Sequence, residues 1–282
     1  MALTIGSALQ TAKKSLAAVS DSPASDSYLL LGAVLNAGKA HLLAFPEQVL
    51  TPAQADQWES WLARAVAGEP LPYILGRRAF YDREFFVTPD VLIPRPETEL
   101  LLEQALEAAA AFPAPVVVDV GTGSGALAVT LAAHVPAARV FAIDRSPAAL
   151  AVARHNAAAQ GVNVTFWEGD LLLPCIQNGL RADVVMANLP YIPGHVVDTL
   201  PVSRWEPRAA LDGGEDGLDL VRRLLAQVPQ ACTPTAAIFL EIGYDQGVTA
   251  VAAAQVALPD ADVRLLPDLA GLDRLVCIWR KK

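Results

Sequence analysis

The strongest constraint on the fold is an alternation of short apolar runs with stretches of helical periodicity, which begins near residue 116 and continues towards the C-terminus. Short runs that are apolar throughout are typical of strands buried on both faces, and such strands belong to parallel sheets flanked by helices. We therefore predict an α/β domain with a largely parallel sheet. Its candidate strands are residues 116–118, 140–143, 164–166, 184–186, 237–240 and 275–278.

The chain before this alternation has a different pattern. From Ile5 to about Val66 apolar residues recur at helical spacing, which predicts a small bundle of short helices. Two short runs around Asp82-Arg83 then indicate a β-hairpin, and three closely spaced prolines follow it. The expected organisation is an all-helical domain over residues 1–75, a hairpin and proline-rich linker over 76–96, and the α/β domain over 97–282.

The net charge and the cysteine positions bear on whether the protein binds nucleic acid, binds a metal ion or forms a disulfide. A net charge of -9 and an isoelectric point near 4.9 disfavour broad attraction to nucleic acid, so no direct nucleic-acid binding is expected. The three cysteines lie far apart, without metal-ligand spacing, so neither a metal site nor a disulfide is expected. No stretch predicts an export signal or a membrane span. We expect a cytoplasmic protein, and a monomer.

A glycine-rich segment, Asp119 to Gly125, comes directly after the first buried strand and opens a helical run. Glycines at alternate positions let the backbone approach a ligand, and the free N–H groups of the helix start favour a polar or anionic group. Asp144 ends the next strand, where a carboxylate can accept hydrogen bonds from both hydroxyls of a ribose. The pattern predicts an adenosine-containing cofactor. A tight turn with an incidental aspartate, or a nicotinamide dehydrogenase, remains an alternative here.

Two further acidic residues favour S-adenosyl-L-methionine over a dinucleotide. Asp119 at the strand tip could hold the ammonium of a methionine moiety, and Asp170 could accept from the adenine amino group, although an aspartate there can also simply form a turn. The predicted product is S-adenosyl-L-homocysteine. The candidate cofactor-binding residues are Asp119, Gly121, Thr122, Gly123, Ser124, Gly125, Asp144, Asp170, Leu171 and Asn188.

The tetrapeptide Asn188-Leu189-Pro190-Tyr191 follows the fourth strand, at the edge where open α/β sheets bind ligands. A planar NH2 group is a poor nucleophile because its lone pair is delocalised. If Asn188 Oδ1 accepts one N–H and the Leu189 carbonyl accepts the other, the nitrogen is drawn towards tetrahedral geometry, and Tyr191 can stack on the planar group. We predict Asn188, Pro190 and Tyr191 as catalytic, and all four residues as substrate-binding. A proline-stiffened turn is the alternative.

These two segments resemble class I S-adenosylmethionine-dependent amino-methyltransferases, and the wider sequence is similar to the HemK/PrmC-type protein-(glutamine-N5) methyltransferases of peptide chain release factors. The most specific stretches of this resemblance are residues 92–99 (Leu-Ile-Pro-Arg-Pro-Glu-Thr-Glu) and 212–217 (Asp-Gly-Gly-Glu-Asp-Gly). The resemblance implies a Rossmann-like catalytic domain, a helical domain that docks the release factor, and a loop that receives the glutamine of a Gly-Gly-Gln motif. It implies methyl transfer to the N5 atom of that glutamine.

Departures from the family pattern keep alternatives open. The usual tetrapeptide is Asn-Pro-Pro-Tyr, and Leu189 in its second place resembles rRNA adenine-N6 methyltransferases, so an enzyme that methylates adenine N6 of RNA or DNA is the second hypothesis. A non-catalytic module is the third, disfavoured because Asn188 and Tyr191 are intact. Glu206 and Arg208 are expected either to pair with each other, ordering the substrate loop, or to stay solvated. Glu241 at a strand tip reads as an edge carboxylate.

Overall fold

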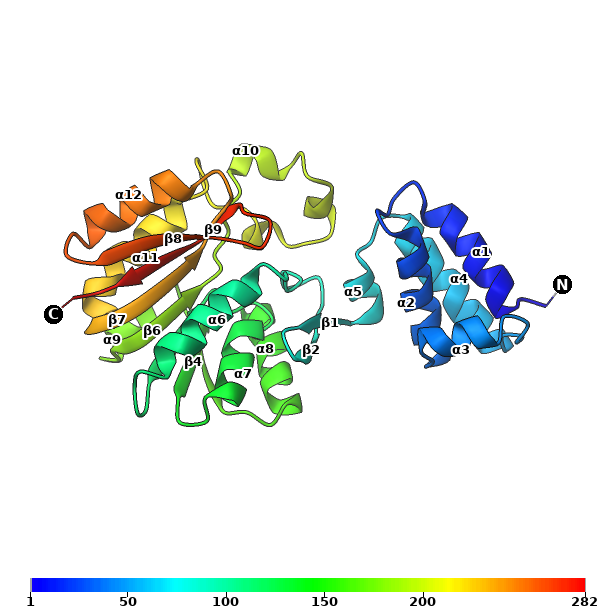
Figure 1. Ribbon diagram of the computed structural model, residues 1–282, viewed down its shortest axis with the longest axis horizontal. Helices are drawn as coiled ribbons and strands as arrows, with labels where there is room; N and C mark the ends of the chain where they lie inside the picture. The colour runs from blue at the N-terminus through cyan, green and yellow to red at the C-terminus, as the bar shows by residue number, and fades with distance from the viewer. Residues whose placement is uncertain (1, 282) are drawn as a thin grey trace. The chain divides into compact units, whose positions relative to one another are not determined.

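A computed structural model describes residues 2–281, and the chain divides into two compact units, one ending at Arg77 and the other beginning at Arg78. The described residues of the smaller unit form five helices, which Figure 1 labels. These are α1 (Ile5–Leu16), α2 (Pro23–Leu35), α3 (Lys39–Ala44), α4 (Pro52–Val66) and α5 (Leu71–Leu75).

Local signals set the ends of these helices. The Thr4 and Thr51 side chains each accept a hydrogen bond from the backbone N–H three residues later, and so cap α1 and α4. Proline stands in the first turn of α2 and of α4, where no backbone donor is needed. The inner faces of the helices enclose a hydrophobic core of their own, with Trp58 2% exposed.

The predicted hairpin is present. Strands β1 (Arg77–Phe80) and β2 (Arg83–Phe86) form a two-stranded sheet, and Tyr81 in the turn takes a positive φ of 57°. Phe80 and Phe85 are buried in the core of the larger unit. The backbone of Phe86 is held from both sides by the side-chain amide of Asn156, so the hairpin is attached to the rest of the larger unit.

The larger unit contains a seven-stranded sheet in the order β5-β4-β3-β6-β7-β9-β8. Only β9 runs against the others, so the predicted α/β fold with a mostly parallel sheet is confirmed. The strands are β3 (Val116–Val120), β4 (Arg139–Asp144), β5 (Val164–Glu168), β6 (Ala182–Ala187), β7 (Cys232–Glu241), β8 (Asp262–Pro267) and β9 (Asp273–Trp279).

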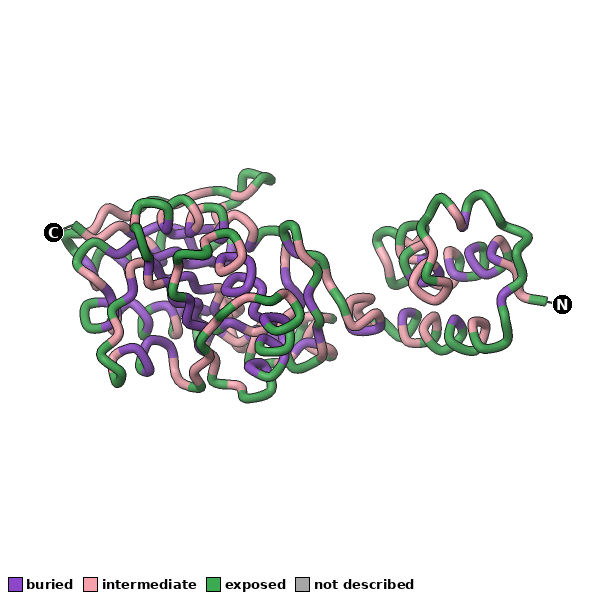
Figure 2. The backbone as a smooth tube through the Cα atoms, turned by 90° about the horizontal axis from the view of Figure 1, so that it is seen from below, coloured by how far each residue is buried: buried purple, intermediate pink, exposed green. Residues whose placement is uncertain are grey.

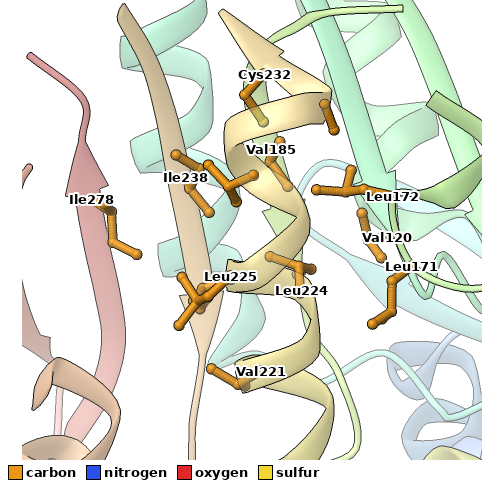
Figure 3. Packing of buried hydrophobic residues seen from close by; sticks show 14 of the residues in the cluster. Val120, Leu171, Leu172, Val185, Val221, Leu224, Leu225, Cys232, Ile238 and Ile278 are labelled. Carbon is orange, nitrogen blue, oxygen red and sulfur yellow. The ribbon is translucent and has the colours of Figure 1, made fainter. Parts of the chain in front are cut away.

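Helices cover both faces of this sheet (Figure 1). On one face lie α6 (Thr98–Ala109), α7 (Ala126–His134) and α8 (Pro147–Ala159); on the other lie α9 (Leu173–Gln177), α11 (Asp219–Ala231) and α12 (Gly247–Ala257). In Figure 3, Leu224 and Leu225 of α11 lie over Ile238 of the sheet. Buried stretches run through the interior of the unit, and its surface loops are exposed (Figure 2).

The strand order changes direction between β3 and β6, which lie side by side although two strands separate them in the chain. The loops that leave their carboxyl ends diverge at such a point, and open α/β sheets bind ligands there. After β6 the chain forms only short helices, α10 (Gly194–Val197), η1 (Pro201–Arg204) and η2 (Arg208–Ala210), before α11 begins. None of the described helices is long and apolar enough to cross a membrane.

Candidate active site

A cavity opens at the carboxyl ends of β3, β4 and β6, and most of the predicted site residues line it. The predicted residues that line it are Gly121, Thr122, Gly123, Ser124, Asp144, Asp170, Leu171, Asn188, Leu189 and Pro190. Asp119, Gly125 and Tyr191 are not among its lining residues. The cavity wall also includes Asp90, Val91, Leu92, Pro94, Arg95 and Thr98, and Ala209 and Ala210 of η2, for which the sequence predicted no site role.

The glycine loop has a backbone that other residues would strain. Gly121, Gly123 and Gly125 have φ of 72°, 53° and 81°, which is the left-handed region. A Cβ at Gly121 would lie 3.1 Å from Leu189 Cδ2, and one at Gly125 would lie 3.0 Å from the Cβ of Ala153. The glycines therefore serve both the turn and the close approach of neighbouring elements.

Asp119 lies beneath this loop and is 1% exposed. Its Oδ2 accepts hydrogen bonds from the Thr122 hydroxyl (2.6 Å) and the Ala128 N–H (3.3 Å), so it supports the loop and the start of α7. Its Oδ1 has no partner among the described residues. Burial raises the pKa of this carboxyl to about 7, and the two hydrogen bonds only partly oppose that. The predicted contact of Asp119 with a ligand ammonium stays a prediction, and Oδ1 is the carboxylate oxygen that remains available to make it.

Asp144 stands at the end of β4, on the cavity wall. Its Oδ2 accepts the Gly123 N–H (3.0 Å) and its Oδ1 accepts the Ser146 N–H (2.9 Å), which ties the glycine loop to the start of α8. Each carboxylate oxygen can accept more than one hydrogen bond, so both can still take a hydroxyl donor from a ligand. The geometry is compatible with the predicted ribose contact.

Asp170 and Leu171 form the wall after β5. Asp170 is paired with Arg223 of α11, so its carboxylate is already engaged on one oxygen. Leu171 has a positive φ of 52° and is 6% exposed, and its side chain joins the hydrophobic core in Figure 3. A leucine in this backbone region is uncommon, which indicates that the surrounding packing holds the turn.

The Asn188–Tyr191 loop is held by side chains from distant parts of the chain. The Asn188 amide nitrogen donates to the Thr98 hydroxyl (2.9 Å), and the Tyr191 carbonyl accepts from the Gln246 amide (2.8 Å). Leu189 is 4% exposed and faces the glycine loop. With its amide nitrogen committed to Thr98, Asn188 has its amide oxygen left to accept a donor from the cavity that it lines.

The segment 212–217 packs directly on that loop, which explains its glycines. A Cβ at Gly213 would lie 2.6 Å from the Pro190 carbonyl oxygen, and one at Gly217 would lie 2.1 Å from the Tyr191 carbonyl oxygen. The Ile192 N–H donates to the Leu211 carbonyl, and the Ile192 carbonyl accepts from the Gly213 N–H. Residues 212–217 therefore support the Asn188–Tyr191 loop through their backbone.

The sequence-based alternatives for Glu206 are both wrong. Glu206 is 2% exposed and accepts two hydrogen bonds from Arg95 (2.6 and 2.7 Å), so it neither pairs with Arg208 nor stays solvated. Arg208 instead pairs with Asp198 and Asp212. Burial raises the pKa of Glu206, and Arg95 opposes this. The pair ties the Ile-Pro-Arg-Pro motif to the loop before η2, a contact that spacing along the chain could not reveal.

Glu241 is no edge carboxylate. It ends β7 inside the sheet, is 2% exposed, and its Oε2 has no partner among the described residues. Burial raises its pKa to about 7, and the positive charge of Arg274 opposes that rise. Burial and the Glu241 charge raise the pKa of Tyr191 to about 12, so Tyr191 is a neutral phenol at neutral pH. Glu241 was interpreted from the sequence as an edge carboxylate because a lone carboxylate at a strand end carries no pattern that reveals its burial.

No cluster of three or more His, Cys, Asp or Glu residues suited to a metal ion occurs within residues 2–281.

Comparisons with known proteins agree with this division of the chain. Residues 7–76 match the PrmC N-terminal domain family, and residues 117–200 match a methyltransferase domain family. The chain is 41% identical to the release factor glutamine methyltransferase of Moorella thermoacetica, over 99% of this chain and 100% of that one. It is 39% identical to the protein of the same name from Koribacter versatilis, over 97% and 98%.

One solved structure supports the fold alone. The ribosomal protein L11 methylase of Lactobacillus delbrueckii subsp. bulgaricus is 22% identical, with a TM-score of 0.50 over 70% of this chain and 84% of that one.

Proposed function

The chain belongs to the family of release factor glutamine methyltransferases, and we propose that it methylates the side-chain amide nitrogen (N5) of the glutamine in the Gly-Gly-Gln motif of a peptide chain release factor. The proposed methyl donor is S-adenosyl-L-methionine, which the methyltransferase family implies.

The observation that carries this proposal is the orientation of Asn188. Its amide nitrogen is bonded to Thr98, so the group it offers to the cavity is an acceptor, and an acceptor is what the N–H of a planar NH2 group requires. The loop also meets the glycine loop directly, since Leu189 lies against Gly121. A substrate held by the Asn188–Tyr191 loop would therefore lie next to a cofactor held by the glycine loop.

The residues around the glycine loop fit an adenosine-containing cofactor. A Cβ at Gly123 would have no atom nearer than the Gly121 carbonyl oxygen at 4.0 Å, so this part of the loop is open, and the oxygens of Asp144 retain capacity for two hydroxyl donors. When bound, S-adenosyl-L-methionine supplies an electrophilic methyl group on a sulfonium and is released as S-adenosyl-L-homocysteine.

The chain contributes positioning and electrostatics to the reaction. Asn188 Oδ1 and the Leu189 carbonyl each accept one N–H of the glutamine amide, which draws its nitrogen towards tetrahedral geometry and directs the lone pair to the methyl group. The positive charge that develops on nitrogen is stabilised by these two oriented dipoles, and the proton becomes acidic enough to leave without a strong base. Pro190 stiffens the loop, and Tyr191, whose carbonyl is fixed by Gln246, is proposed to stack on the amide plane.

The smaller unit is proposed to dock the release factor. It has its own hydrophobic core and matches the PrmC N-terminal domain family. An acidic chain is also better suited to a protein substrate than to nucleic acid.

Incubation with labelled S-adenosyl-L-methionine and separately purified release factor, ribosomal RNA and DNA tests the substrate class. We expect label in the release factor, and none in a release factor whose Gly-Gly-Gln glutamine is replaced by alanine. Label in nucleic acid alone would support the adenine-N6 hypothesis, which Leu189 favours, and would overturn the proposal.

A further inference from the structure

Arg95 on the cavity wall uses only part of its guanidinium within the chain. Its Nη2 atom donates to both carboxylate oxygens of Glu206, at 2.7 and 2.6 Å. A guanidinium has five N–H donors and Nη2 carries two of them, so three remain on Nε and Nη1. Within residues 2–281 these two atoms have no hydrogen-bond partner, and neither is among the buried unpaired side-chain atoms. Arg95 therefore keeps three donors that a ligand in the cavity can reach.

Glu206 holds this guanidinium in place. The Glu206 side chain is 0% exposed and its Oε1 also accepts the Ile93 N–H at 3.3 Å, whereas the Arg95 side chain is 36% exposed. A buried carboxylate with two bonds to one guanidinium restricts its orientation and supplies its counter charge. The free donors of Arg95 are thus held in place, and a neutral oxygen acceptor suits them better than an anion.

The contacts around residues 93–98 lie on the substrate side of the cavity. Thr98 accepts the Asn188 amide N–H at 2.9 Å. Burial raises the pKa of Tyr191 to about 12, and the positive charge of Arg95 is among the groups that oppose this rise. Within the described residues, no hydrogen bond joins residues 93–98 to the glycine loop. These contacts favour the molecule held by the Asn188–Tyr191 loop, rather than the cofactor, as the partner of Arg95.

We propose that Arg95 is a substrate-binding residue whose Nε and Nη1 donate to backbone carbonyl oxygens of the peptide next to the reacting glutamine, and that Glu206 is a positioning residue that acts through Arg95. This inference rests on the proposed function. A Gly-Gly-Gln segment suits such a contact, because its glycines have no side chains to keep another group away from the backbone. Arg95 fixes the peptide backbone while Asn188 holds the glutamine amide.

The variant Arg95→Lys tests this contact, because lysine keeps a cation beside Glu206 but lacks the planar fork of donors. We expect the KM for the release factor to rise about tenfold, the value of one hydrogen bond from a charged donor. The kcat and the cofactor Kd should stay within about twofold. Arg264→Lys, in an exposed ion pair with Asp262, is the matched control and should leave all three quantities unchanged.

A wild-type KM in Arg95→Lys would overturn the proposal, because it would show that Arg95 serves only its ion pair with Glu206. A rise in the cofactor Kd would also overturn it, since the free donors would then belong to the cofactor. Absence of release-factor methylation by the wild type would instead contradict the proposed function, so the two failures are distinguishable.

Glu206→Gln tests the positioning role. In the wild-type background it should raise the KM for the release factor about threefold or more, because the guanidinium is held less firmly. Combined with Arg95→Lys it should add less than about twofold, since the donors that Glu206 positions are already absent. Equal effects in the two backgrounds would show that Glu206 does not act through Arg95 and would overturn its assigned role.

The Nε–H signal of Arg95 in NMR spectra of the wild-type enzyme provides a test that does not depend on the folding of a variant. With the enzyme saturated with S-adenosyl-L-homocysteine, this signal should shift when the release factor is added. A signal that the release factor leaves unchanged would overturn the proposal.

Discussion

The loop after β3 and the loop after β6 lie at the same edge of the sheet but are built in opposite ways. The glycine loop is shaped by its own backbone, through positive φ angles at Gly121, Gly123 and Gly125, and is tied by Asp119 and Asp144 near the ends of β3 and β4. The Asn188–Tyr191 loop is fixed from outside, by Thr98, 90 residues away, and by Gln246, 55 residues away. Each stands near a buried carboxyl, Asp119 or Glu241, with a pKa raised by burial to about 7.

This difference separates what each loop can be expected to do. A loop fixed by its own backbone can hold a cofactor in a constant position, whereas a loop held by remote side chains orients the substrate only as well as those side chains do. Changes in the first loop should therefore affect cofactor affinity, and changes in the second should affect the rate of methyl transfer. The predictions below test this separation, from the largest effect to the smallest.

Asn188→Ala should have the largest effect. We expect kcat to fall by at least ~10²-fold, because the Asn188 side-chain oxygen acts on the nitrogen mainly as charge develops in the transition state. Cofactor affinity should remain nearly intact, since Asn188 is bonded to Thr98 and not to the glycine loop. Single-turnover kinetics and calorimetric cofactor binding would measure the two quantities; a variant that keeps its kcat would show that the amide is not held as described.

Asp144→Ala should show the opposite pattern. It removes the acceptor that holds Gly123 and Ser146 and is proposed to bind the ribose. Loss of a hydrogen bond to a charged group costs about 1.5–3 kcal/mol, so cofactor Kd should rise roughly tenfold to a hundredfold. Equilibrium binding would check this, with Asp82→Ala as an exposed control. An unchanged Kd would remove Asp144 from the cofactor site.

Asp119→Asn tests the buried support of the glycine loop through pH. The folded-state pKa of Asp119, about 7, is above its ordinary value of 3.8, so the folded state binds the proton more tightly and wild-type stability falls as pH rises between those values. Asparagine does not titrate, so the variant lacks this pH-dependent contribution to stability. The unfolding free energy of the variant relative to wild type should improve by about 1 kcal/mol or more from pH 4 to pH 8, measured by urea titration. A constant difference would argue against a shifted pKa.

Leu189→Pro should have the smallest effect. Only the backbone carbonyl of position 189 contacts the substrate in the proposed reaction, and proline keeps a carbonyl while losing an N–H. We expect glutamine methylation to stay within about threefold of wild type or to improve as the loop stiffens. Steady-state kinetics on the release factor would decide; a large loss would mean that the contact of the leucine side chain with the glycine loop is required for activity.

The same contrast explains how much the sequence could predict. The α/β fold and the position of both loops followed from apolar runs and from glycine and proline patterns, which are local signals. Strand β8 was missed because its residues are mostly half-buried and include the charged Asp262 and Arg264. The partner of Glu206 was also missed, since Arg95 reaches it only through the fold. The sequence therefore predicted features that depend on neighbouring residues, but not side-chain contacts between residues far apart in the chain.

Tandem mass spectrometry of the release factor after incubation with the enzyme and S-adenosyl-L-methionine tests the central claim most directly, because it locates the methyl group. The account predicts the mass of one added methyl group on the side chain of the Gly-Gly-Gln glutamine, formed by the wild type and strongly reduced with Asn188→Ala. A methyl group on any other residue, or an unmodified glutamine under conditions where the enzyme methylates ribosomal RNA or DNA, would contradict it.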